Sequence, residues 1–135
     1  MGYHGIMLHR DYILRMVQRF VRVLLPALER IEETGDALAI TEMEGAIAEL
    51  VELEPVMLLS LTPDSLTTFV ALSPNADAVA PYMVWGLRRV AEACERVGDE
   101  FTARLRGQQA DAVAAAFGLE PDVVPEDVAE ALDEE

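Results

Sequence analysis

A chain of 135 residues is long enough to bury its own core, and we expect residues 1–135 to form a single domain. Hydrophobic residues make up 52% of the chain, but no apolar run approaches the roughly 20 residues of a membrane span, and the single cysteine excludes an internal disulfide or a multi-cysteine metal site. The net charge of −15 would repel phosphate backbones, which makes nucleic acid a poor partner.

The first predicted helix covers residues 11–33, after an N-terminal arm at residues 1–10. A possible N-cap, Asp11, opens it. Pro26 lies inside the pattern and predicts a kink or local break, because proline removes one backbone donor. Apolar residues recur at helical spacing on the inward side: Ile13, Val17, Phe20, Leu24, Leu28 and Ile31.

A Gly-Asp pair ends this helix and starts the next. Gly35 can adopt the left-handed conformation that ends a helix, and the Asp36 side chain can cap the second helix, residues 37–53. The proline at position 63 predicts the start of a short third helix. The apolar residues of the second helix that we expect to point inward are Ile40, Met43, Ile47, Leu50 and Val51.

Two further long helices and a short one are predicted in the second half. They cover residues 77–97 and 100–117, joined at Gly98 and Asp99, and residues 125–132 within an acidic C-terminal segment, residues 119–135. The expected inward residues are Val79, Met83, Leu87, Val90, Cys94 and Val97 on the first of these helices, and Phe101, Leu105, Ala112, Val113 and Ala116 on the second.

No segment alternates apolar and polar residues as a strand does, so we predict an all-α fold of five to six helices packed as antiparallel hairpins. The two Gly-Asp turns are 63 residues apart, close to twice a repeat length in the thirties. Each turn resembles the inter-helix turn of tetratricopeptide repeats, which implies tetratricopeptide-like packing of the hairpins.

The stretch from Arg10 to Val17 contains Asp-Tyr-Ile-Leu-Arg at residues 11–15. It resembles the opening of an uncharacterised family of small bacterial helical proteins that begin with an Asp-Tyr-Ile-X-Arg helix. The resemblance covers the first third to half of the chain and implies a fold and a bacterial origin, but no activity. The N-terminus lacks the pattern of a secretory signal, so we expect a cytoplasmic location.

The basic residues gather in the first helix, with five arginines and two acids in residues 1–30. Arg15, Arg19 and Arg22 follow one another at spacings of four and three, which aligns them as a stripe on one helix side. Such a stripe suits pairing with carboxylates. The carboxylates can belong to a partner protein or to the domain's own acidic helices, and the sequence leaves both open.

A second candidate surface lies on the helix predicted at residues 77–97. Tyr82 and Trp85 lie three residues apart beside Arg88 and Arg89, a set that can line a groove by stacking and cation–π contact. The alternative is that the aromatic rings pack between the hairpins while the arginine heads reach solvent.

No residue is predicted to be catalytic, cofactor-binding or metal-ligating. His4 and His9 lie near the N-terminus without a further histidine, and Cys94 falls on an apolar stripe where a thiol is unreactive. Glu42, Glu49 and Glu52 follow one helix side, where they are expected to face solvent.

These features favour a non-enzymatic protein–protein interaction module. Its simplest form is a homodimer through the first helix and the N-terminal arm. Together these segments contain more apolar residues than one helix side facing the core requires, so the others can form a symmetric interface. The alternative is a small-ligand-binding protein or enzyme with a pocket between hairpins. That pocket would use Tyr82, Trp85, Arg88, Glu42 and Glu49. The apolar residues of the arm are Tyr3, Ile6, Met7 and Leu8.

Overall fold

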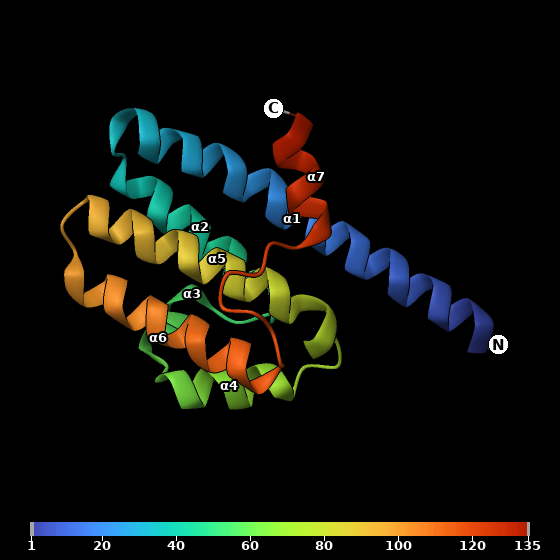
Figure 1. Cartoon of the computed structure of the whole chain (residues 1–135). Coiled ribbons are helices and arrows are strands. Elements are labelled where there is room, and N and C mark those ends of the chain that lie inside the picture. The colour runs from blue at the N-terminus through green and yellow to red at the C-terminus, as the bar shows by residue number, and fades with distance from the viewer. Residues whose placement is uncertain (1, 135) are drawn as a thin grey trace.

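The computed structural model describes the backbone of residues 2–134 and the side chains of residues 11–130 except Leu59. Over residues 2–134 the chain forms seven helices and no strand, which confirms the predicted all-α class (Figure 1). The helices are α1 (Gly2–Thr34), α2 (Ala37–Leu50), α3 (Pro55–Ser60), α4 (Pro63–Ala71), α5 (Ala76–Arg96), α6 (Glu100–Ala116) and α7 (Glu126–Glu134).

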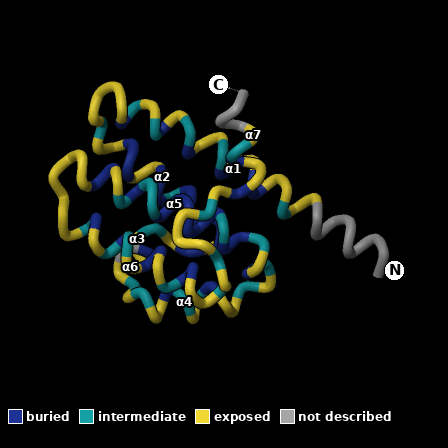
Figure 2. Tube along the Cα trace, viewed as in Figure 1, coloured by how far each residue is buried: buried dark blue, intermediate teal, exposed yellow. Residues whose placement is uncertain are grey.

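Two antiparallel hairpins dominate the architecture. Helices α1 and α2 form the first and α5 and α6 the second, with α2 packed on α5 and α4 packed on α6 (Figure 1). Most of the buried residues lie where these helices face one another (Figure 2). The amphipathic patterns therefore produce one continuous core that runs between the two hairpins.

Both hairpins turn at the predicted Gly-Asp pairs. Gly35 has a φ of 68° and Gly98 a φ of 86°, the left-handed region in which glycine has no Cβ penalty. Asp36 accepts a hydrogen bond from the backbone N–H of Leu38, and Asp99 accepts one from that of Thr102. Each pair therefore ends one helix and caps the next.

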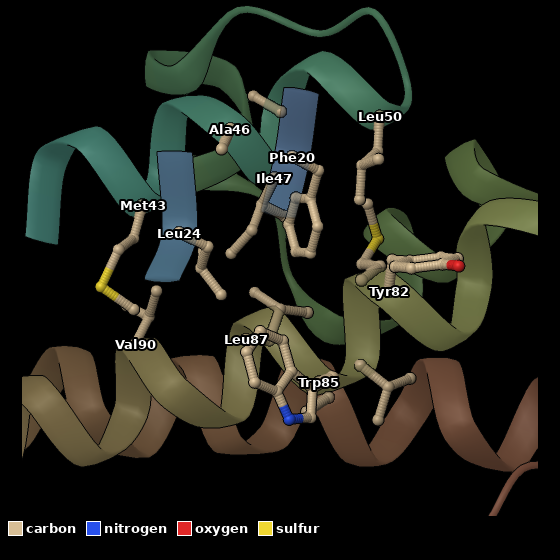
Figure 3. Close-up of a cluster of buried hydrophobic side chains, with 14 of the residues drawn as sticks. Phe20, Leu24, Met43, Ala46, Ile47, Leu50, Tyr82, Trp85, Leu87 and Val90 are labelled. Carbon is tan, nitrogen blue, oxygen red and sulfur yellow. The ribbon is translucent and has the colours of Figure 1, made fainter. Parts of the chain in front are cut away.

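The centre of the core is a tight crossing of α1, α2 and α5. The Phe20 ring meets the rings of Tyr82 and Trp85 edge-on, at centroid distances of 5.9 and 6.4 Å (Figure 3). A Cβ atom at Gly86 would lie 2.9 Å from Cγ1 of Ile47 and 3.1 Å from the Phe20 ring. The absence of a side chain at Gly86 therefore allows α5 to approach the other two helices closely.

The first helix is longer than predicted. Its backbone is helical from Gly2, so residues 2–10 continue α1 and Asp11 is not its N-cap. The side chains of the predicted arm lie outside the described part of the chain. Pro26 does not break the helix either: it is exposed, and α1 continues to Thr34.

The region after α2 also differs from the prediction. The second helix ends at Leu50 instead of residue 53, and Pro55 opens the additional short helix α3. Glu52 has a φ of 55°, so the chain turns sharply after α2. The three residues after Leu50 that were predicted to be helical therefore belong to a turn. Glycine is the usual signal for such a helix end, and because Glu52 occupies the left-handed position instead, the sequence does not predict this turn.

The buried face of α6 is rotated from the predicted one. Phe101 and Ala116 are exposed, Phe101 by 80%, while the fully enclosed positions include Arg106 and Gln109. Val97, which was predicted to point inward at the end of α5, is also exposed. Val113 is buried as predicted, but two of the six buried residues of α6 are polar, so apolar spacing alone identifies its buried face only in part.

Candidate interaction surface on the first helix

The three arginines of the predicted stripe are exposed on α1. The side chains of Met16, Val17, Phe20 and Leu24 fix this orientation, because they are buried on the opposite side of the helix. Within the part of the chain whose side chains are described, the ion pairs involve other arginines, and none involves Arg15, Arg19 or Arg22. The surface formed by these three residues is called the α1 stripe below.

A mixed-charge groove lies along one side of the α1 stripe. Arg15 and Arg19 of α1 line it together with Glu49 and Glu52, and Leu53 and Pro55 complete part of its lining. The groove exists because α2 stops short beside the much longer α1. The groove brings arginines and glutamates near one another without close ion pairs between them. Its arginines can therefore still bind carboxylates of another molecule.

Tyr12 and Glu52 form one defined contact in this groove. The Tyr12 hydroxyl donates a hydrogen bond of 2.7 Å to a Glu52 carboxylate oxygen. This bond, together with the negative charge of Glu52, raises the pKa of the Tyr12 hydroxyl. Glu52 occupies the left-handed position that ends α2, a strained conformation for a residue with a side chain, and its carboxylate points to α1.

A second groove lies on the other side of the α1 stripe, between α1 and the beginning of α7. Leu14, Val17 and Val21 supply an apolar wall, and Arg22 and Asp127 supply charges at its edges. Helix α7 is anchored here because Val128 is fully buried and the Tyr82 hydroxyl donates a hydrogen bond of 2.8 Å to Asp127. We call this the α1–α7 groove.

The predicted surface around Tyr82 and Trp85 is not formed. Both aromatic side chains are buried, at 9% and 3% exposure, because α1 and α2 cover this side of α5 (Figure 3). Burial and the contact with Asp127 raise the pKa of the Tyr82 hydroxyl. The alternative, aromatic rings packed between the hairpins, is the observed arrangement.

The two arginines of that predicted surface are engaged within the chain. Arg88 donates hydrogen bonds to the carbonyl oxygen of Pro121 and to Asp111, and thereby holds the segment before α7 against α5 and α6. Arg89 lies 5.5 Å from the Trp85 ring centroid and pairs with Glu92. Neither arginine converges with Tyr82 on a pocket.

A buried polar network is the feature that the sequence did not reveal. Arg106 on α6 is 1% exposed and donates to Glu44 on α2 at 2.8 Å and to Gln109 at 2.7 Å. The Gln109 amide donates in turn to the carbonyl oxygen of Leu61 at 2.9 Å. The network joins α2, α6 and the segment between α3 and α4, and its groups satisfy one another, so its arrangement is structural.

The remaining candidate reactive groups whose side chains are described lie apart from one another. Cys94 is buried, and its burial and the nearby carboxylates Glu44 and Asp99 raise its thiol pKa to about 11. Glu42 pairs with Arg30, and Glu49 is exposed in the mixed-charge groove. The candidate ligands His4 and His9 lie outside the described side chains.

Two further findings concern metals and membranes. Among the described side chains, no three histidine, cysteine, aspartate or glutamate residues gather as they do around a metal ion. Across the same described portion, none of the helices combines the length and the apolar character that crossing a membrane requires.

Comparison of the chain with protein-family models, with curated proteins and with solved structures gives no match. The α1 stripe and its two flanking grooves are therefore interpreted from their own geometry and charge.

Proposed function

We propose that the protein is a non-enzymatic protein–protein interaction module that binds its partner through the α1 stripe. The observation that carries this proposal is the exposure of Arg15, Arg19 and Arg22 without an ion pair to the described carboxylates. An arginine presents five donors in a planar fork, so three aligned arginines suit the carboxylates of a protein surface.

The charge distribution supports a protein partner. The first 30 residues carry five arginines against two acids, whereas the other 105 residues carry five arginines against 23 acids. A basic stripe on an acidic body attracts acidic groups locally and repels extended polyanions such as nucleic acid. The partner is therefore a protein with an acidic surface, met in the bacterial cytoplasm that the sequence predicts.

The grooves beside the stripe support the same proposal. Charged groups at the edges fix orientation, while Leu14, which is 47% exposed, and the partly buried Val21 supply apolar area that a partner can bury. The tetratricopeptide-like packing and the family resemblance predicted from the sequence remain predictions, and both agree with a helical module of this kind.

The experiment that tests the proposal is capture from a lysate of the source organism. The wild-type chain is compared with an Arg19→Glu/Arg22→Glu variant and with an Arg96→Glu/Arg104→Glu control, which changes the net charge equally at two exposed arginines far along the chain. A partner should be retained by the wild type and the control, lost by the α1 variant, and weakened at high salt. Equal retention by all three proteins would contradict the proposal.

A further inference from the structure

The α1 helix carries a second apolar row beside the one that enters the core. Met7, Leu14, Val21 and Leu28 recur every seven residues in the sequence, the spacing with which helices pair in coiled coils. Of the three members whose side chains are described, Leu14 is 47% exposed and Val21 and Leu28 are partly buried. The row therefore follows the edge of the core and remains accessible at Leu14.

The first part of α1 has no neighbouring helix. At 1.5 Å per residue, the 33 residues of α1 span about 50 Å, whereas the 14 residues of α2 span about 21 Å. The N-terminal part of α1 projects from the rest of the molecule (Figure 1). Met16 is the first of the described residues whose side chain is buried. Most helical stability in proteins comes from tertiary packing, so this part of α1 gains stability when it packs on a further surface.

The α1–α7 groove complements the projecting part in charge. Its far wall is the start of α7, where Glu126, Asp127 and Glu130 are exposed. Residues 2–10 contain Arg10, two histidines and no acid. The part of α1 before Met16 carries Arg10 and Arg15 against one acid, Asp11, and Asp127 lies at the edge of the groove, so the charges of the two are complementary between copies.

We infer that the occupant of the α1–α7 groove is the α1 helix of a second copy of this chain. The two α1 helices run antiparallel about a two-fold axis near Leu14, so the projecting part of each lies along Val21 and beside α7 of the other. The contact is isologous, since both copies use the same surface. This inference rests on the proposed function, because the groove borders the α1 stripe, and it names the occupant of that groove.

Sedimentation velocity of the full chain tests this arrangement. We expect a species of twice the 14.8 kDa chain mass at tens of micromolar. Leu14→Glu should raise the dissociation constant at least about 100-fold, because the substitution enters a symmetric interface twice. The matched control Leu72→Glu, at a 78% exposed position on α4, should remain a dimer.

Each outcome decides the inference. A wild-type chain that is monomeric up to 100 µM would overturn it, as would a Leu14→Glu dimer of wild-type strength; circular dichroism confirms that both variants are helical. A monomer that still retains an acidic partner through Arg19 and Arg22 in the capture experiment leaves the proposed function standing and rejects only self-association.

Oxidative cross-linking tests the position of the axis. A Leu14→Cys chain should form a disulfide-linked dimer, whereas Leu72→Cys should not. The native Cys94 is buried and does not compete. A wild-type chain that is dimeric while Leu14→Cys fails to cross-link would contradict the axis near Leu14.

Discussion

At the scale of single residues, the buried Arg106 is the most consequential side chain of the fold. It donates hydrogen bonds to Glu44 on α2 and to Gln109 on its own helix. Arg106 and Glu44 are 62 residues apart in the sequence, so this one side chain links two distant helices. A buried charge is tolerated only when it is paired and hydrogen-bonded. The network is therefore sensitive to the loss of one partner and much less sensitive to the loss of both.

We predict that Arg106→Met destabilises the protein by about 3–5 kcal/mol, because Glu44 is then left buried without its partner. The double variant Glu44→Met/Arg106→Met should recover part of that loss, since apolar side chains replace the whole pair. Urea unfolding of the two single variants and the double variant measures the coupling. Additive losses would show that the two residues do not act as a pair.

The thiol of Cys94 predicts a pH dependence of stability. Its pKa in the folded chain is about 11 against an ordinary value of 9.0, because burial disfavours the thiolate. The neutral thiol stabilises the fold fully below pH 9, and this contribution is lost as the pH rises toward 11. The free energy of unfolding of the wild type should therefore fall relative to that of Cys94→Ala between these values. Parallel pH profiles of the two proteins would contradict the burial of the thiol.

At the scale of helices, the close crossing of α5 with α1 and α2 depends on Gly86. Any side chain there meets Ile47 and Phe20, whereas Gly107 on α6 has open space around the position of a Cβ. The same substitution at these two helical glycines therefore separates packing from helix propensity, because only one of the positions is enclosed.

We predict that Gly86→Val destabilises the protein by about 1–3 kcal/mol through overpacking, while Gly107→Val leaves stability unchanged or slightly raised. Thermal unfolding followed by circular dichroism compares the two variants. Equal melting temperatures for them would show that the helices do not cross as closely as described.

Most of the helices can be predicted from the sequence, because their start and stop signals are local. The Gly35-Asp36 and Gly98-Asp99 pairs mark both hairpin turns, and the inward residues of α2 follow from helical spacing. The side of α6 that enters the core cannot be predicted in this way. Four of its six buried residues are apolar, but the burial of Arg106 depends on Glu44, a long-range pairing that no local pattern contains.

The candidate site, too, can be predicted from the sequence only where local spacing decides the structure. The alignment of Arg15, Arg19 and Arg22 follows from their spacing, but their freedom from internal ion pairs depends on where α2 ends. Tyr82 and Trp85 share a helix side with the core, so their burial depends on the approach of Phe20 from α1. The sequence gives each residue's neighbours along a helix, and only the fold decides which helix covers them.

At the scale of the whole molecule, the chain separates a basic helix from an acidic body. The acids of the C-terminal segment outnumber its bases eight to none over residues 120–135, and the start of α7 is held beside α1 by Val128 and by the contact of Asp127 with Tyr82. Opposite charges therefore lie on the two sides of one groove. This arrangement favours association through α1 at low salt and weakens it as salt screens the charges.

The measurement that tests the central claim most directly is site-specific photo-cross-linking at Gln18. This exposed residue lies between Arg15 and Arg22 and borders the α1–α7 groove. A photoreactive amino acid at position 18 should yield an adduct in cells, either a dimer of the 14.8 kDa chain or a conjugate with another protein, whereas the same group at position 104 should yield none. Adducts at position 104 and none at position 18 would contradict recognition through the first helix.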